Sequence, residues 1–308
     1  MLLIAVGVSV FAKSPNAVAD HKTESVDLWF FQTNVRYQFR TEAIRLALSY
    51  TDNMTPTIRL RPWTESLTQQ RAVSVIRSGR YPIFATLTEH RQFRLPELVR
   101  SNDNLIAGVM GFRVLLTQQG ALDKLYQVST LRHLRERLRF GFGQHWLDYS
   151  ILQANGLELV GTPHYSNLFP MLEAGRFDAI PRGLNEFIAE ERYWGERHPS
   201  LQSFDAYALY YPYPVYLYIH KDYEWILERI NYGVFRAEQD GRMRRLFERH
   251  FADEIEWLNT RKPKLFVLRN DFVDPSLTIE NVCWWVPEAL LQQISPSKNC
   301  DNRVSADH

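Results

Sequence analysis

Cysteine, net charge and metal-ligand patterns are scarce in this sequence. Its 308 residues include two cysteines, Cys283 and Cys300, and no histidine or cysteine cluster has the spacing of zinc ligands. In an exported protein, two cysteines favour one disulfide that closes a short C-terminal loop, with two unpaired thiols as the alternative. The 36 basic and 35 acidic residues give a formal net charge of +1. This balance argues against a broad basic surface for nucleic acid or anionic lipid. No metal, cofactor or nucleic-acid partner is predicted.

No hydrophobic run is long enough to cross a membrane. The best candidate, residues 1–12 (MLLIAVGVSVFA), is shorter than the roughly 20 residues that a membrane helix needs. Ala17 and Ala19 follow in the A-x-A arrangement that signal peptidase accepts. Residues 1–19 are therefore predicted to be a signal peptide, cut after Ala19, and the mature protein to lie in the periplasm. No Lys or Arg precedes the apolar run, so an upstream start or a buried strand is the alternative.

Catalytic motifs are missing too. The sequence contains no G-x-S-x-G, H-E-x-x-H or cysteine–histidine nucleophile pattern, and an enzyme is not predicted. Aromatic residues are plentiful at 13% of the chain, with eight Trp and fifteen Tyr. Such side chains fill protein cores and also line small-molecule clefts.

Strand-like and helix-like segments alternate in the first part of the chain. Strands are predicted over residues 26–31, 57–62 and 81–87, and helices over 41–50 and 64–79. This β-α-β-α-β order implies a parallel sheet with helices packed on it.

A second unit repeats this architecture without repeating the residues. Strands are predicted over residues 138–143, 157–163 and 176–181, and helices over 148–156 and 166–175. The chain therefore contains two successive α/β units.

Two extended apolar stretches, residues 104–119 and 210–222, flank the second unit, and we expect them to be crossover strands that act as a hinge. The predicted fold is α/β with two lobes. Lobe 1 comprises residues 25–112 and 215–308, including the C-terminal extension, and lobe 2 comprises residues 113–214. Ligands of open α/β sheets bind outside the carboxyl ends of the strands, so the cleft between the lobes is the predicted site.

Four segments carry a family resemblance through their order and spacing. They are PWTESLTQQRAVSVIRSGRYPIFATLTEHR (62–91), FGFGQHW (140–146), YSNLFPMLEAGRFDAI (165–180) and YPYPVYLYIHKD (211–222). Together they resemble the type II periplasmic solute-binding proteins, in particular solute-binding family 3, which includes amino-acid-binding components of ABC importers. The resemblance implies a two-lobe fold with two crossover hinge strands.

The resemblance also implies that Arg91 grips the carboxylate of a ligand, helped by Thr86 five residues before it. The physical chemistry agrees, because a guanidinium group presents a planar fork that makes two charge-assisted hydrogen bonds to a carboxylate. The alternative is that Arg91 caps a loop and pairs with Glu89 or Glu97.

One departure from the family pattern concerns the ligand ammonium group. Amino-acid binders commonly carry an aspartate five residues beyond the position of Asp178, and this chain has Gly183 there, preceded by Arg182. A cation at this place is expected to repel an ammonium group and to favour a second anionic group. Glu186 could replace the missing aspartate only if the turn is displaced.

Further candidates for the cleft wall are aromatic residues and the residues of one turn. Gln144 and His145 follow a glycine turn whose backbone N–H groups could bind an anion near a helix start. For each candidate, plain packing or a surface turn is the alternative. The candidates are Tyr37, Trp63, Gln144, His145 and Trp146.

A protein of this kind is expected to be a monomer that closes its lobes over a small carboxylated solute, either an amino acid or an organic acid. It would present the solute to an ABC permease or to a membrane sensor. Two alternatives are a stand-alone sensory module and an enzyme of the same fold with dehydratase-like chemistry. For the enzyme, only Glu186 and His145 are candidate general bases.

Overall fold

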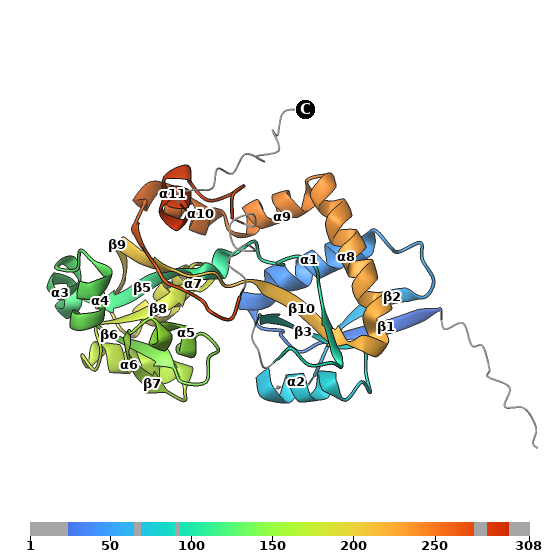
Figure 1. Ribbon diagram of the computed structural model, residues 1–308, viewed down its shortest axis with the longest axis horizontal. Coiled ribbons are helices and arrows are strands. Elements are labelled where there is room, and N and C mark those ends of the chain that lie inside the picture. Colours follow the sequence, from blue (N-terminus) through green and yellow to red (C-terminus); the bar gives the residue numbers. More distant parts are fainter. Residues whose placement is uncertain (1–23, 65–68, 90–92, 274–281, 296–308) are drawn as a thin grey trace, which may run out of the picture.

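The computed structural model describes residues 24–64, 69–89, 93–273 and 282–295. The predicted signal peptide, residues 1–19, lies outside these ranges. Within them, no helix is long and apolar enough to span a membrane. The described chain forms two lobes, each built on its own β-sheet (Figure 1).

The first lobe contains a five-stranded mixed sheet with the order β2-β1-β3-β10-β4. β1 runs parallel to β2 and β3, whereas β10 is antiparallel to β3 and β4. β3 is buried along its whole length, as a central strand covered on both faces should be. The strands are β1 (Ser25–Phe30), β2 (Thr57–Pro62), β3 (Ile83–Thr88), β4 (Leu98–Arg100) and β10 (Val215–His220).

Helices cover both faces of this sheet. α1 (Gln38–Ser49) and α8 (Glu224–Gln239) pack against each other on one face, and α2 (Gln69–Arg77) lies on the other (Figure 1). The two helices on the first face approach closely because Gly233 has no side chain: a Cβ there would lie 2.0 Å from the carbonyl oxygen of Ala47.

The second lobe contains a six-stranded sheet with the order β11-β9-β5-β8-β6-β7. β5 is antiparallel to β8 and β9, while β6 is parallel to β7 and β8. The strands are β5 (Phe112–Gln118), β6 (Arg139–Gly143), β7 (Glu158–Thr162), β8 (Ala179–Gly183), β9 (Leu201–Tyr210) and β11 (Lys264–Val267). The helices are α3 (Leu122–Tyr126), α4 (Leu131–Arg137), α5 (Tyr149–Ala154), α6 (Leu168–Glu173) and α7 (Leu184–Gly195).

The described chain passes between the two sheets three times. It leaves the first sheet after β4 and enters the second at β5, then returns through residues 211–214, between β9 and β10. After α8 it passes back to the second sheet, which it joins at β11. The predicted two-lobe α/β fold with crossover strands is confirmed.

The C-terminal segment contacts both lobes. α9 (Arg242–His250) packs on α1 and α8, and α10 (Ala252–Arg261) contacts α7. β11 pairs in parallel with β9, and α11 (Glu288–Ile294) packs on β11. The prediction that residues 215–308 all belong to lobe 1 is therefore wrong for β11 and α11. The physical reason is that β9 has an open edge, which β11 pairs while burying Phe266.

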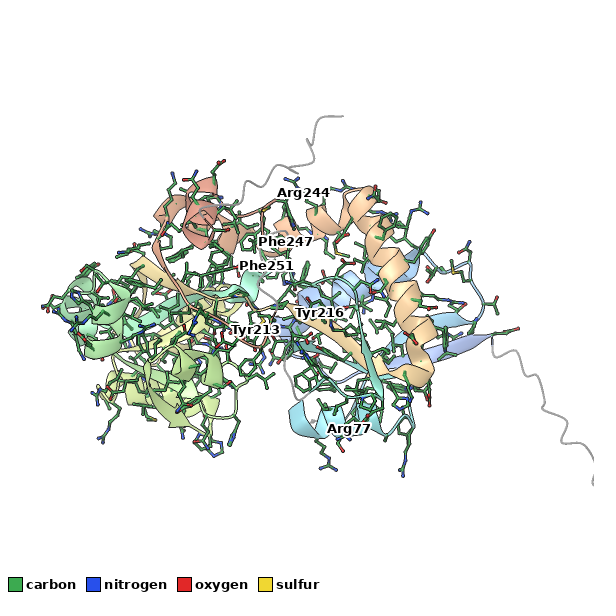
Figure 2. The ribbon with its side chains drawn as sticks, in the orientation of Figure 1. Arg77, Tyr213, Tyr216, Arg244, Phe247 and Phe251 are labelled. Atoms are coloured by element: carbon green, nitrogen blue, oxygen red, sulfur yellow. The ribbon has the colours of Figure 1, made fainter. Side chains whose placement is uncertain are left out.

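Aromatic side chains of this segment pack where the first crossover begins. The ring centroid of Trp285 lies 5.5 Å from that of Phe112, at the start of β5, and 5.4 Å from that of Phe247 in α9. Its indole N–H donates a hydrogen bond of 2.8 Å to the carbonyl oxygen of Ala107. Figure 2 shows Phe247 and Phe251 at the junction of the two lobes. Through Trp285, the C-terminal segment stabilises the start of the first crossover, which leads into β5.

Candidate functional site

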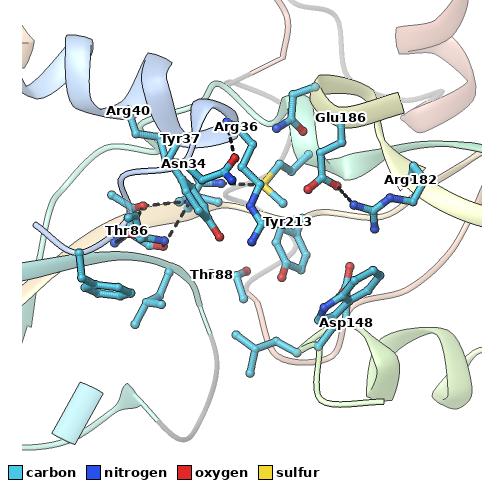
Figure 3. A pocket seen from close by; sticks show the side chains of 18 of the residues that line it. Asn34, Arg36, Tyr37, Arg40, Thr86, Thr88, Asp148, Arg182, Glu186 and Tyr213 are labelled. Carbon is cyan, nitrogen blue, oxygen red and sulfur yellow. Dashed lines mark hydrogen bonds and ion pairs between the residues drawn. The ribbon is translucent and has the colours of Figure 1, made fainter. Parts of the chain in front are cut away.

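A cavity of about 660 Å³ lies between the two lobes, a volume that suits a small molecule. Its wall comes from the loop after β1, the start of α1, the end of β3, the turn after β6, the start of α7 and the crossover (Figure 3). Charged side chains from both lobes line it: Arg36, Arg40, Arg113, Asp148, Arg182 and Glu186.

The first-lobe wall is shaped by a tight turn after β1. The side-chain oxygen of Asn34 accepts a hydrogen bond from the backbone N–H of Arg36 and begins a 3-10 turn that leads directly into α1. Arg36 lies in this 3-10 turn and Arg40 in the first turn of α1. Their guanidinium carbons lie 4.9 and 4.8 Å from the ring centre of Tyr37, within the range of a cation–π contact.

Arg40 is buried without a carboxylate partner among the described residues. Its Nη1 donates a 2.9 Å hydrogen bond to the Thr86 hydroxyl, and its Nη2 donates to the thioether sulfur of Met110 at 2.9 Å. The Thr86 hydroxyl in turn donates to the side-chain oxygen of Gln32 at 2.7 Å. Burial lowers the pKa of Arg40 below its ordinary value, because it removes the charged guanidinium from water and the more distant Tyr37 and Glu186 offset this only in part.

Several buried polar atoms at the cavity make no hydrogen bond within the described chain. They are the hydroxyl of Thr88, the side-chain oxygen of Asn185 and Nε of Arg113. Buried polar groups without a partner are costly. A bound molecule could satisfy groups from both lobes at once.

Arg113 lies on β5, where its guanidinium group contacts one carboxylate and two tyrosine rings. Its Nη2 lies 2.7 Å from Oδ2 of Asp148, which also accepts a 2.8 Å hydrogen bond from the Tyr211 hydroxyl. The guanidinium packs on the rings of Tyr211 and Tyr213. Burial alone would lower the pKa of Arg113, but Tyr211 and Asp148 outweigh it and the pKa is raised.

Arg182 faces the cavity with its charge compensated twice. Its Nε and Nη2 donate to the two carboxylate oxygens of Glu190, and Nη2 lies 3.0 Å from Oε2 of Glu186. The guanidinium also packs on the ring of Trp146. Burial opposes the charge, but the two glutamates outweigh it and raise the pKa of Arg182. Arg182 is thus not the free cation that the sequence suggested beside a ligand ammonium group.

Glu186 reaches the cavity because α7 begins directly after β8. Its carboxylate accepts a 3.3 Å hydrogen bond from the backbone N–H of Gly183. Burial would raise the pKa of Glu186, but Arg182 and Arg113 lower it below its ordinary value, so the carboxylate is ionised. It occupies the part of the site where the family resemblance placed an aspartate.

The structure brings five of the eight predicted ligand-binding residues to the cavity: Tyr37, Thr86, His145, Trp146 and Arg182. The Thr86 hydroxyl accepts a hydrogen bond from Arg40, and the ring of Trp146 packs on the guanidinium group of Arg182.

The other predicted site residues lie elsewhere. Trp63 packs on the rings of Trp29 and Tyr81 within lobe 1. Gln144 does not line the cavity, although its side chain contacts the ring of His145. Arg91 lies outside the described residues, so its role stays a prediction. Cys283 is disulfide-bonded, and its predicted partner Cys300 lies outside the described residues.

The sequence reasoning missed Arg36, Arg40, Thr88, Arg113 and Asp148. A signal was present for two of them. Arg40 falls on the same helical face as apolar residues, and Arg113 interrupts the apolar strand sequence GFRVLL. A charged residue at such a position is rarely buried without a partner, so it indicates a polar group elsewhere in the protein or a bound ligand.

No family model matches the chain, and no curated protein matches it. Solved structures do resemble it. An ancestral arginine-binding protein bound to arginine covers 75% of this chain and 100% of its own, with a TM-score of 0.52 and 13% identity. An amino acid ABC transporter substrate-binding protein from Streptococcus pneumoniae, bound to L-arginine, covers 75% and 96%, with a TM-score of 0.50 and 13% identity. A Salmonella typhimurium periplasmic binding protein with high arginine specificity covers 74% and 99%, with a TM-score of 0.50 and 14% identity.

These likenesses establish the fold: the chain has the two-lobe α/β fold of the type II substrate-binding proteins of amino-acid ABC transporters. The solved structures are covered almost completely, whereas about three quarters of this chain takes part in the alignments. The chain therefore carries sequence beyond the shared fold.

Proposed function

We propose that this protein binds a small carboxylate-bearing solute, an amino acid or another organic acid, in the cavity between its lobes. It then presents the closed complex to the permease of an ABC importer or to a membrane sensor. One observation carries the proposal: charged groups from both lobes face a single cavity of about 660 Å³, and polar atoms on both walls have no partner in the described chain. The fold shared with amino-acid-binding proteins supports it.

The two walls offer opposite chemistry. The first-lobe wall offers donors, the guanidinium groups of Arg36 and Arg40 and the hydroxyl of Thr88, which suit a carboxylate. The second-lobe wall offers acceptors, the carboxylate of Glu186 and the side-chain oxygen of Asn185, which suit an ammonium group. A ligand that bonds to both walls has higher affinity for the closed form, and this difference drives closure.

Export and a monomeric state complete the proposal. Export is supported by the signal-peptide pattern of residues 1–19. On the strength of the family resemblance, we also propose that Arg91 grips the ligand carboxylate, helped by Thr86.

The direct test is thermal unfolding of the purified protein against amino acids, organic acids and short peptides, with mass spectrometry of any small molecule that co-purifies. A ligand should raise the melting temperature with the logarithm of its concentration. Thr88→Val removes a cavity hydroxyl but keeps the shape, and should weaken binding about 3- to 10-fold. Thr260→Val, at an exposed position of α10, is the control and should bind like the wild type. A flat response across the panel, with no co-purifying molecule, would refute the proposal.

A further inference from the structure

We propose that the ligand is a dicarboxylic acid, with or without an amino group, in preference to a neutral or basic amino acid. This inference rests on the proposed function and adds the charge of the ligand. It follows from how the charged side chains of the cavity pair with one another.

On the second-lobe wall every guanidinium group has a carboxylate partner. Arg113 pairs with Asp148 at 2.7 Å. Arg182 pairs with Glu186 at 3.0 Å and with Glu190 at 2.5 Å. The carboxylates of this wall outnumber its guanidinium groups by one, so an anionic group of a ligand gains little there.

The first-lobe wall carries two guanidinium groups and no carboxylate. Arg40 donates to a hydroxyl, a backbone carbonyl and a thioether. Arg36 packs on Tyr37 and, within the described ranges, forms no ion pair. Both arginines interact electrostatically with the carboxylate of Glu186, which belongs to the opposite wall (Figure 3). The like charges of the two arginines repel each other, and the burial of Arg40 adds a desolvation cost.

The cavity therefore has surplus positive charge on one wall. Glu186 on the opposite wall offsets part of this charge, but its carboxylate is already paired with Arg182 at 3.0 Å. A single ligand carboxylate that pairs with Arg36 or Arg40 leaves the other guanidinium without a carboxylate in direct contact. Two carboxylates compensate both, and each can meet the planar fork of a guanidinium with paired hydrogen bonds.

The hydrogen-bond donors point to the same conclusion independently of net charge. Nη2 of Arg40 has only a thioether sulfur, which is a weak acceptor. The Thr88 hydroxyl has no acceptor in the described chain. A ligand rich in carboxylate oxygens supplies the acceptors that these donors lack.

The test is isothermal titration calorimetry of the wild type with matched ligands. Glutamate and aspartate are compared with glutamine and asparagine, which have the same shape and one carboxylate fewer, and with glutarate, succinate and arginine. At least one dicarboxylic acid should bind about tenfold or more tightly than its neutral counterpart. Comparing glutamate with glutarate shows whether the amino group adds affinity through the acceptors of the second lobe.

Two variants locate the effect. Arg36→Met should weaken dicarboxylate binding about tenfold or more and weaken binding of the neutral counterpart less, so that the preference for the dicarboxylic acid falls. Arg40→Met should act in the same direction. Because Arg40 is buried, the exposed Arg36 provides the variant whose folding is not at stake. Arg132→Met, at an exposed arginine of α4, is the matched control and should bind normally.

The outcomes separate this inference from the proposed function. Binding of monocarboxylates or neutral amino acids as tight as that of dicarboxylic acids overturns the inference and leaves the proposed function standing. Unchanged selectivity in Arg36→Met also overturns it. If no carboxylate of any kind binds, both fail together.

Discussion

Arg182 and Arg40 are both buried at the cavity, with 2% and 6% of their surface exposed, yet their surroundings differ. Arg182 is enclosed by Glu186 and Glu190, so its charge is neutralised within the protein. Arg40 has neutral partners only. The guanidinium group of Arg182 links β8 to α7 in the second-lobe wall. That of Arg40 is available to bind an anion. The partners of an arginine, and not its residue type, decide between a structural and a binding role.

Glu190→Gln tests the structural role of Arg182. The change leaves a buried guanidinium with one carboxylate in place of two. Breaking a buried ion pair costs roughly 3–5 kcal/mol when no partner remains, and with Glu186 still present we expect a loss of about 2 kcal/mol in the free energy of unfolding. Urea denaturation measures it. Glu196→Gln, at the exposed C-cap of α7, should change stability by less than about 0.5 kcal/mol. Equal stability of the two variants would contradict the role given to Arg182.

The sequence alone located part of this site. Thr86 and Tyr37 were predicted because strand ends and the family resemblance point to them. Arg40 was not, because an arginine on an amphipathic helix usually extends its charged end into water. Its burial depends on Thr86 and Met110, which are 46 and 70 residues away in the chain. Such long-range neighbours leave no local pattern in the sequence.

The C-terminal segment shows the same limit for strands and helices. An apolar strand-like stretch around residues 264–267 is visible in the sequence, but nothing local indicates which sheet it joins. β11 pairs with β9 in lobe 2 after α9 has packed on lobe 1. The two α/β units, in contrast, were predicted from their own periodicity, because each strand and helix lies next to its neighbours in the chain.

Trp285→Ala tests whether the C-terminal segment stabilises the start of the first crossover. It removes ring contacts with Phe112 and Phe247 and the hydrogen bond to Ala107. A buried Trp→Ala change costs roughly 3–5 kcal/mol, so the melting temperature should fall strongly. Trp285→Phe keeps most of the packing and should lose about 1 kcal/mol for the missing hydrogen bond.

The control for this experiment is Phe235→Ala on α8, because Phe235 is 54% exposed. It should change stability by less than about 0.5 kcal/mol. A Trp285→Ala protein as stable as this control would show that the C-terminal segment does not hold the crossover.

The arrangement of the two lobes links these local features to function. Two crossovers join the lobes, and the C-terminal segment, which runs from lobe 1 to β11 in lobe 2, forms a third connection. The cavity lies between the lobes, with the surplus positive charge on one wall and paired charges on the other. A dicarboxylic ligand would therefore be attracted first to lobe 1, and lobe 2 would close over it afterwards.

Small-angle X-ray scattering can detect this closure. A single compact body of 308 residues has a radius of gyration of about 19 Å, and an open two-lobed molecule should exceed that value. Saturating amounts of the ligand identified by calorimetry should lower the radius of gyration, because bonds to both walls favour the closed form. At a ligand concentration that saturates only the wild type, Arg36→Met should keep the larger radius. Binding that saturates without any fall in radius would mean that the lobes, restrained by the C-terminal segment, already hold the ligand-bound arrangement before the ligand arrives.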